Sequence, residues 1–302
     1  MMKSTRKAYG EFLSQLGEDK NVVVLDADLA TATKTDMFMK EYPERHIDVG
    51  IAEQDLVGTA CGLALSGKTV FASTFAIFMA GRAYDQVRNT AAYSHVNVNL
   101  CATHAGVMVG EDGPTHQCIE DIALMNVVPT MKVLSPADDV STKKILKFCL
   151  NEEGPKYIRL GRSDLEDIYT EDAEFKLGGS NTFGDGTDGT VFAYGPTVSI
   201  ALNAQKELKE KGINIRVVDL YSIKPVDRDI IIKCAKETDK LISIEDHSVI
   251  GGIGSIISNV LCEEYPKKLE KIGIKDTFGK SGNWKVVYEY FGLTKDNIIN
   301  KF

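Results

Sequence analysis

Segments typical of buried strands alternate with segments of helical spacing along most of this 302-residue chain. In the first half, the apolar run 21–29 is followed by helical spacing over 52–67, and the apolar run 69–75 by helical spacing over 80–94. This alternation is typical of a parallel sheet whose strands are joined by helices that cover its faces. The sequence therefore predicts an α/β fold.

The alternation breaks once, between residues 163 and 189, where Asp, Glu and Gly accumulate without apolar periodicity. A chain of this length is expected to form about two domains of roughly 150 residues each. We therefore predict a first domain over 1–165, a linker over 166–188 and a second, smaller α/β domain over 189–302. Further strands are expected over 97–104, 131–136, 155–162, 190–195, 214–220 and 240–247, and further helices over 7–19, 116–127, 137–152, 196–212, 226–237 and 251–261.

Composition argues against several classes of protein. The net charge of −8 argues against a nucleic-acid groove, which needs a basic surface. No apolar run approaches the roughly 20 residues of a membrane helix, and the first residues lack the apolar core of a secretory signal, so a cytoplasmic location is expected. The six cysteines lie far apart, which favours free thiols over disulfides or a zinc site.

The stretch "THAGVMVGEDGPTHQ", residues 103–117, is the most unusual part of the chain because it holds two of only five histidines. Loops after the carboxyl ends of parallel strands are where ligands bind in such sheets. His104 is expected at a strand end and His116 at the start of the next helix, both facing that crevice. Either histidine alone is explained by a helix cap or a satisfied polar group, but both together with Asp112 on one glycine-rich loop favour a binding site.

Two further groups could carry chemistry. Glu53 lies near the start of a predicted helix among apolar neighbours, and a buried carboxyl group tends to stay protonated and to donate a hydrogen bond. The simpler alternative is an acid that complements the helix dipole. Phe75 and Phe78 follow a strand at i and i+3, and on composition alone they are core residues.

Several motifs taken together resemble the C-terminal half of transketolase, which comprises a pyrimidine-binding domain and a C-terminal domain. They are "STRK", "DVGIAEQ", "STFAIF", "THAGVMVGEDGPTHQ", "LGRSD" and "GGIGS", and they extend across nearly the whole chain. The resemblance implies a thiamine-diphosphate enzyme of split type. An N-terminal partner subunit would carry the ligands of the diphosphate and Mg²⁺, and two such pairs would form a cytoplasmic heterotetramer.

The resemblance also implies roles for residues at the cofactor. Glu53 matches the acid that bonds N1′ of the cofactor's aminopyrimidine, and Phe75 and Phe78 match aromatic residues that pack against that ring. Asp28 matches a position beside the cofactor. The family's third aromatic residue falls on Gly81, so this wall of the pocket is expected to be thinner or to be completed by another residue. The Gly-Asp-Gly run at 184–186 is interpreted as a turn and not as a magnesium motif, so no metal ligands are expected in this chain.

Substrate residues carry over in the same way. His104 and His116 match histidines that contact the donor ketose and help to move protons, and Asp112 matches the acid that binds a sugar hydroxyl. Arg6 and Arg162 match two arginines that hold the terminal phosphate of the sugar, a task for which guanidinium groups are suited. The family's phosphate-binding serine aligns with Ala32, although Thr31 or Thr33 could supply the hydroxyl.

Four alternatives remain beside a pentose-phosphate-pathway transketolase. The substrate could end in another anion, such as a sulfonate, in place of phosphate. The chain could be similar to 1-deoxyxylulose-5-phosphate synthase or to the β subunit of a 2-oxoacid dehydrogenase, but both lack the paired histidines in the full loop. It could also be a catalytically idle assembly subunit, although polar residues that are costly to bury are rarely explained by packing alone.

Overall fold

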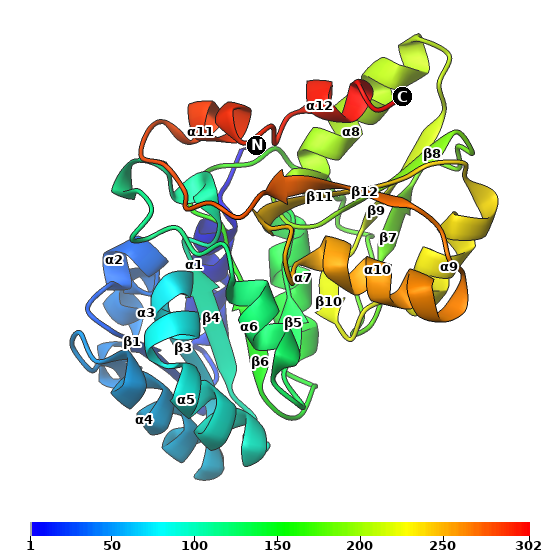
Figure 1. Cartoon of the computed structure of the whole chain (residues 1–302). Helices are drawn as coiled ribbons and strands as arrows, with labels where there is room; N and C mark the ends of the chain where they lie inside the picture. Colours follow the sequence, from blue (N-terminus) through cyan, green and yellow to red (C-terminus); the bar gives the residue numbers. More distant parts are fainter. Residues whose placement is uncertain (1) are drawn as a thin grey trace.

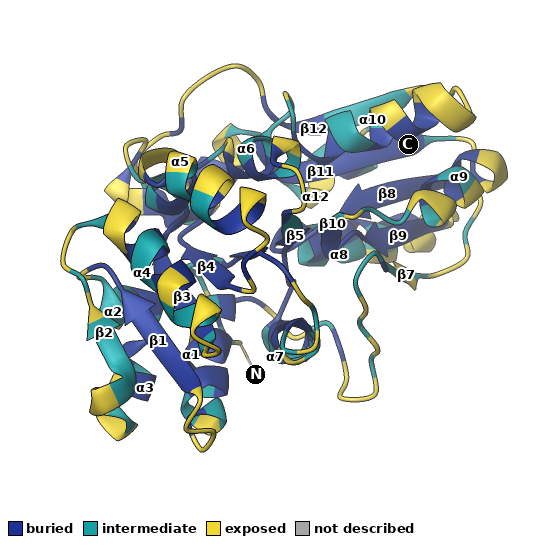
Figure 2. Cartoon of the chain, turned by 90° about the horizontal axis from the view of Figure 1, so that it is seen from below, coloured by how far each residue is buried: buried dark blue, intermediate teal, exposed yellow. Residues whose placement is uncertain are grey.

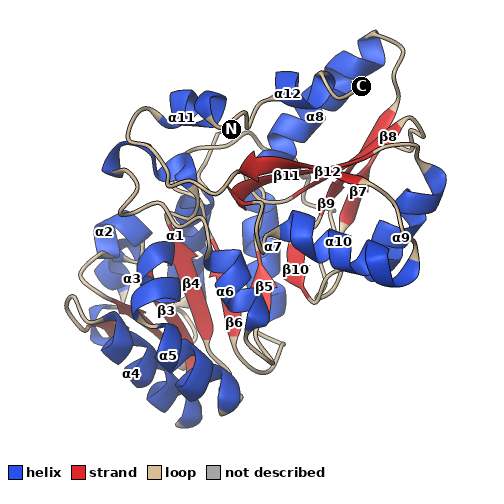
Figure 3. Cartoon of the chain, viewed as in Figure 1, coloured by secondary structure: helices blue, strands red, loops and turns tan. Residues whose placement is uncertain are grey.

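The computed structural model describes residues 2–302 as two twisted sheets with helices on their faces (Figures 1 and 3). The first sheet has seven strands in the order β10-β5-β6-β4-β3-β1-β2, and all neighbours are parallel except β10 and β5. Its strands are β1 (Val22–Asp26), β2 (His46–Asp48), β3 (Thr69–Phe75), β4 (Asn99–Thr103), β5 (Lys132–Leu134), β6 (Lys156–Arg159) and β10 (Ser222–Lys224).

The second sheet has five strands in the order β12-β11-β8-β9-β7, and only β7 runs antiparallel to its neighbour. Its strands are β7 (Asn181–Phe183), β8 (Gly189–Ala193), β9 (Ile215–Asp219), β11 (Leu241–Ser248) and β12 (Leu269–Ile274). The predicted α/β class, with two mostly parallel sheets covered by helices, is thus confirmed.

Helices cover both sheets. Those of the first part are α1 (Thr5–Leu16), α2 (Ala30–Thr33), α3 (Asp36–Glu41), α4 (Glu53–Leu65), α5 (Tyr84–Gln86), α6 (Asp121–Val127) and α7 (Asp139–Cys149). The second part has α8 (Thr197–Glu210), α9 (Arg228–Glu237), α10 (Ile253–Glu264), α11 (Trp284–Tyr290) and α12 (Lys295–Ile299). A 3₁₀ turn, η1 (Pro43–Arg45), precedes β2; two π-helical segments, η2 (Phe78–Arg82) and η3 (Val87–Tyr93), flank α5; and a 3₁₀ segment, η4 (Val107–Asp112), lies between β4 and α6.

The helix expected over 116–127 was wrong at its start, because α6 begins at Asp121 and His116 lies in a turn. Gly110 and Gly113 both have φ near +75 to +80°, a left-handed conformation that interrupts helical geometry before His116. The region expected to lack structure, 163–189, is largely irregular but contains the edge strand β7.

The two parts of the chain share a strand and a core. β10 lies beyond the irregular region in sequence, yet it pairs with β5 of the first sheet. One buried apolar cluster includes Val133 and Tyr157 from the first part and Phe192, Leu220 and Ile253 from the second. The inner strands β1, β4, β8 and β9 are buried throughout and are dark blue in Figure 2. No helix within residues 2–302 is both long and apolar enough to cross a membrane.

Candidate active site

The strand register brings the first two candidate residues together. β3 and β4 run parallel, and Phe75, the last residue of β3, lies beside Thr103, the last residue of β4. His104 therefore follows directly beside Phe75, and their rings stack with centroids 3.8 Å apart. This places the pair at the carboxyl end of the sheet, the edge at which ligands bind in parallel α/β folds.

A small aromatic cluster joins the second histidine to the first. Phe75 and Phe78 stack with ring centroids 5.7 Å apart and planes inclined by 12°. The edge of His116 meets both phenylalanines, at centroid distances of 6.2 Å and 5.6 Å. Each histidine Nδ1 lies 2.9 Å from the hydroxyl of the preceding threonine, Thr103 or Thr115, and these contacts orient the rings.

His104 is held in its neutral form. Its Nε2 lies 3.3 Å from Nη1 of Arg6, and because a guanidinium group only donates, Nε2 is the acceptor and Nδ1–H donates to Thr103. Burial, together with the positive charges of Arg6 and Arg162, lowers the pKa of His104 to about 2. A neutral imidazole with this tautomer can accept a hydrogen bond or a proton at Nε2.

Two arginines form a positively charged wall next to this histidine. Arg6 Nε donates to the carbonyl of Arg162 at 3.0 Å, and Arg6 Nη1 donates to the carbonyl of Ala32 at 2.7 Å. Arg162 donates to the carbonyl of Val109 and lies 3.4 Å from a carboxylate oxygen of Asp112. Burial and the charge of Arg162 lower the pKa of Arg6. Two neighbouring guanidinium groups with one partly exposed acid between them suit an anionic ligand.

The hydroxyl groups next to Ala32 are not equivalent. Thr33 is buried and donates to Asp26 Oδ2 at 2.6 Å, so its hydroxyl is already used within the protein. Thr31 is exposed. The charge of Lys34 also lowers the pKa of His104, which places a further cation near this wall that the motif analysis missed.

Glu53, the first residue of α4, has a side chain only 4% exposed. It is not isolated, because its Oε1 accepts a hydrogen bond from Nη1 of Arg82 at 2.9 Å. The Arg82 guanidinium also lies over the ring of Phe78, 4.0 Å from its centroid, and so joins Glu53 to the aromatic cluster. Arg82 was missed from the sequence, although its i+4 spacing from Phe78 on a helical segment is a usable signal.

Asp28 follows the end of β1, the strand next to β3. It is exposed beyond the end of β1, has φ of +59°, and its backbone N–H donates to Asp48 at 3.0 Å. The nearby Asp26 is buried, accepts hydrogen bonds from Leu29, Thr33 and Thr35, and has its pKa raised to about 6 by burial. The structure therefore brings together the expected histidines, phenylalanines, arginines, Asp112 and Glu53, whereas the contact it gives for Asp28 is with Asp48.

The residues present fit one half of a cofactor site. A buried carboxylate next to aromatic faces suits a flat nitrogen-containing ring, and Gly81 is exposed, with no atom within 4 Å of a Cβ added there. Within residues 2–302, no group of three or more His, Cys, Asp or Glu side chains could hold a metal ion.

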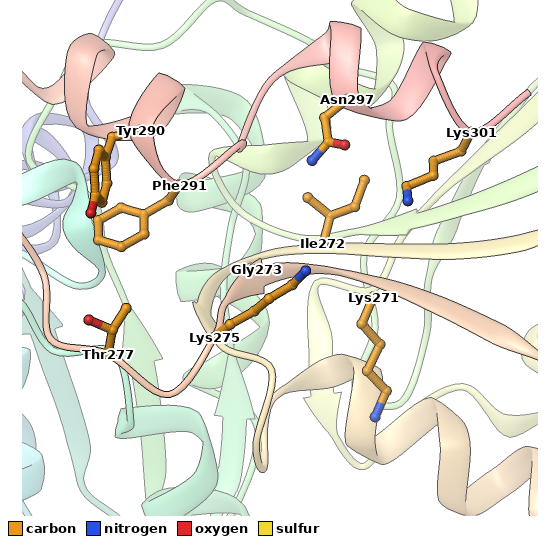
Figure 4. A pocket seen from close by; sticks show the side chains of 9 residues that line it. All are labelled: Lys271, Ile272, Gly273, Lys275, Thr277, Tyr290, Phe291, Asn297 and Lys301. Atoms are coloured by element: carbon orange, nitrogen blue, oxygen red, sulfur yellow. The ribbon is translucent and has the colours of Figure 1, made fainter.

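A separate pocket of about 280 Å³ lies between β12 and the two C-terminal helices (Figure 4). Figure 4 shows Asn297 and Lys301 above Ile272 and Lys275 in this pocket, and it shares no residue with the histidine crevice. Lysines beside a free edge strand such as β12 are a common protection against edge-to-edge pairing. The histidine crevice is therefore the better candidate for an active site.

The fold is that of a two-domain α/β protein whose histidines, arginines and buried acid gather at the carboxyl end of the first sheet. Family models match the chain twice: "Transketolase, pyrimidine binding domain" over residues 1–167 and "Transketolase, C-terminal domain" over residues 179–298. The chain therefore belongs to the transketolase family, whose members depend on thiamine diphosphate.

Similar proteins are themselves sections or subunits of transketolases. The "Putative transketolase C-terminal section" of Methanocaldococcus jannaschii is 45% identical, with 99% of this chain and 95% of that protein covered. One of the subunits of an apulose-4-phosphate transketolase from Phocaeicola vulgatus is 40% identical over 98% of this chain and 96% of that protein. A solved structure described as "Split gene transketolase, inactive beta4 tetramer" has a TM-score of 0.91 at 46% identity, covering 98% of this chain and 96% of that one.

Proposed function

We propose that this chain is the C-terminal subunit of a split, thiamine-diphosphate-dependent transketolase. Together with an N-terminal subunit it would transfer a two-carbon ketol unit from a ketose phosphate to an aldose phosphate. One observation supports this most directly. His104, the buried Glu53 and the Arg6–Arg162 pair lie around the aromatic cluster that Phe75 and Phe78 form. A proton carrier, a ring-binding acid and an anion site are the parts that such a transfer needs on this side of the cleft.

Each side chain has a proposed task. Thiamine diphosphate, when bound, supplies the nucleophilic carbon that accepts and returns the two-carbon unit. Glu53 would share a proton with N1′ of the aminopyrimidine. Phe75 and Phe78 would pack against the aminopyrimidine ring, and Asp28 would lie at the rim of the cofactor site. The neutral Nε2 of His104 would accept a proton or hydrogen bond from the sugar, with His116 acting on a neighbouring oxygen.

The anion end of the crevice sets the substrate class. Arg6 and Arg162 would bind the terminal phosphate, and Asp112 would accept a hydrogen bond from a sugar hydroxyl. With Ala32 in place of a serine and the Thr33 hydroxyl bound to Asp26, the exposed Thr31 is the neighbour of Ala32 that could offer a hydroxyl to the phosphate. The proposed donor and acceptor are sugar phosphates.

This chain would supply only half of the proposed cofactor site, so the proposal requires a partner subunit. An N-terminal subunit would supply the diphosphate-binding domain and the Mg²⁺ ligands, and two such pairs would assemble into a cytoplasmic heterotetramer. The chain covers nearly the whole length of one relative named as a C-terminal section and of another named as a transketolase subunit, and one similar chain is described as an inactive tetramer. We accordingly propose that this chain alone self-associates without transferring ketol units.

The test is a reconstitution with the N-terminal subunit encoded next to this chain, using xylulose 5-phosphate and ribose 5-phosphate with thiamine diphosphate and Mg²⁺. Activity is expected only in the mixture. Glu53→Gln should lower kcat at least a hundredfold while leaving assembly intact, because the amide cannot share a proton with N1′. Asp55→Asn is the matched control, since Asp55 lies in the same helical turn but is exposed and bonds only to Thr59. Retained turnover in Glu53→Gln would remove Glu53 from this role.

A further inference from the structure

The histidine-bearing loop (residues 104–117) packs closely against the C-terminal domain at two glycines of the loop. A Cβ at Gly106 would lie 2.0 Å from a carboxylate oxygen of Asp246, and a Cβ at Gly113 would lie 2.2 Å from the hydroxyl oxygen of Ser281. Both glycines also have positive φ. Glycine is therefore needed here both for backbone conformation and for the close approach of the second domain.

Hydrogen bonds join the same surfaces. The backbone N–H of Val107 donates to Asp246 Oδ1 at 2.8 Å, and the hydroxyl of Tyr288 donates to Asp246 Oδ2 at 2.8 Å. At the other end of the loop, Gln117 Nε2 donates to the carbonyl of Lys280 at 2.8 Å. Asp246 belongs to β11 and Tyr288 to α11, so two elements of the C-terminal domain converge on the start of η4 (Figure 1).

Asp246 is itself fixed in place. It is fully buried, and Arg159 at the end of β6 donates to its backbone carbonyl at 2.8 Å. Arg159 is also buried and bonds to Asp121 Oδ2 at 2.9 Å. A buried carboxylate that accepts hydrogen bonds at both oxygens and is anchored through its backbone has little freedom to move.

The loop needs such support because its own structure is weak. η4 is a 3₁₀ segment interrupted by Gly110, which has φ of +75° and ψ of −108°, and 3₁₀ segments have poorer hydrogen-bond geometry than α-helices. His104 lies before this segment, and Asp112 forms its last residue. The distance between these two substrate-facing groups thus depends on how firmly η4 is held.

We infer that Asp246 and Tyr288 are positioning residues that hold the histidine-bearing loop in its substrate-binding geometry through the backbone of Val107. The inference rests on the proposed function for the meaning of that geometry, but the holding of the loop stands by itself. The C-terminal domain would thereby contribute to the active site without touching the substrate. Loss of the Tyr288 hydroxyl leaves Oδ2 of the buried Asp246 carboxylate without its donor. The contact between Asp246 and Val107 is then held less firmly.

The first experiment uses the full chain alone. Amide hydrogen exchange of the peptide covering residues 104–117 is compared between the unmodified chain and Tyr288→Phe. Exchange at Val107 should be up to about tenfold faster in the variant, because the Asp246 carboxylate that accepts from Val107 loses its second donor and is held less firmly. Tyr290→Phe is the matched control because Tyr290 lies on the same helix with an exposed side chain and should leave exchange unchanged. Equal exchange in Tyr288→Phe and the unmodified chain would overturn the inference.

Asp246→Asn keeps the size of the side chain and an oxygen acceptor for Val107 but loses the charge. Its exchange at Val107 should be at least as fast as in Tyr288→Phe, because a neutral amide with a single oxygen replaces the carboxylate that accepts from both Val107 and Tyr288. Circular dichroism of both variants establishes that the fold is retained before the exchange rates are compared. An Asp246→Asn chain that folds and exchanges like the unmodified one would show that the carboxylate does not hold the loop.

The second experiment uses the reconstituted pair. Tyr288→Phe should lower kcat/KM for the donor ketose about tenfold, mainly through KM, and leave the apparent affinity for thiamine diphosphate unchanged. An equal loss of cofactor affinity would indicate general damage, and an unchanged kcat/KM beside faster exchange would show that loop position does not matter to substrate; both outcomes contradict the inference. If the unmodified pair transfers nothing, the proposed function fails, and the exchange rates alone decide whether Asp246 and Tyr288 hold the loop.

Discussion

Arg6 and Arg162 carry like charges side by side; Arg6 donates two N–H groups to backbone carbonyls and Arg162 donates one. Their repulsion is opposed at short range by Asp112, whose carboxylate lies 3.4 Å from Arg162. Placing two cations together lowers stability unless an anion binds between them. The two arginines therefore favour the binding of an anion. This preference depends neither on the partner subunit nor on the cofactor.

This preference predicts that inorganic phosphate stabilises the isolated chain. At free phosphate ten times its Kd, the free energy of unfolding should rise by about 1.4 kcal/mol. Arg162→Gln should remove most of that rise, whereas Arg88→Gln, at an exposed arginine that donates to the neighbouring Asn89, should keep it. Thermal unfolding at constant ionic strength measures the effect, and an equal response in both variants would assign it to general salt binding.

The neutral state of His104 predicts a pH dependence. Its folded pKa of about 2 lies below the unfolded value of about 6.5, so the stability linked to it is present above pH 6.5 and is lost as pH falls toward 2. Between pH 7 and pH 5 the loss amounts to about 2 kcal/mol. In His104→Gln this loss is absent, so urea unfolding at the two pH values should show a smaller decrease than in the unmodified chain.

His95→Gln serves as the control for this pH experiment because His95 is an exposed histidine outside the crevice. Other buried groups also titrate, among them His247, whose pKa burial lowers to about 4. Comparing each variant with the unmodified chain cancels their contributions. A His104→Gln chain that loses as much stability as the unmodified chain between pH 7 and pH 5 would show that His104 is not held neutral.

At the scale of elements, two helix glycines have opposite surroundings. A Cβ added to Gly62 in α4 would meet no atom within 4 Å, whereas a Cβ added to Gly10 in α1 would lie 2.5 Å from the carbonyl oxygen of Lys34. Gly62→Ala should therefore raise the free energy of unfolding by about 0.5–1 kcal/mol through helix propensity. Gly10→Ala should lower it by about 1–3 kcal/mol through overpacking. Chemical denaturation of the two variants measures both; destabilisation by Gly62→Ala would mean that the open face of α4 is covered in the isolated chain.

Long elements were predictable from sequence because several turns or alternating residues repeat the same signal. The segments 52–67 and 196–212 thus gave helices that agree closely with α4 and α8. β7 and β10 have three residues each, too few to show a period, and their partners are distant in sequence. The helix start expected at 116 was wrong because Cys118 pairs with Ala105 in a parallel bridge and its carbonyl accepts a hydrogen bond from Gly106, which keeps the chain extended before α6.

The candidate site was predictable only where a contiguous motif carries it. His104, Asp112 and His116 share one loop, and Arg6 and Arg162 come from motifs that resemble those of a known family. Tyr288 and Asp246 belong to helices and strands of another domain, and no local spacing reveals that they meet at Val107. Their contact arises from tertiary packing, which a single sequence does not display.

At the scale of the whole molecule, the two sheets are joined by more than a linker. β10 pairs with β5, so a strand from the second half completes the first sheet. Lys224 at the end of β10 donates to the carbonyls of Asn126 and Val128 at 2.6 Å and 2.5 Å, next to the carboxyl end of α6. A cation at this end of a helix is favourable because the last carbonyl groups carry partial negative charge.

This sharing predicts that the chain unfolds in one cooperative transition. Trp284, the single tryptophan, reports on the C-terminal domain, and the buried thiol of Cys101 reports on β4 of the first sheet. Urea midpoints from Trp284 emission and from labelling of Cys101 should coincide. Lys224→Met should lower both midpoints together, by about 1–3 kcal/mol in unfolding free energy, because it removes hydrogen bonds from a charged donor to both carbonyls. Two outcomes would contradict this prediction: a Lys224→Met chain in which only one midpoint falls, or two different midpoints in the unmodified chain. Either would show that the domains fold independently. The pairing of β10 with β5 would then be a contact between separately folded domains and not part of a common core.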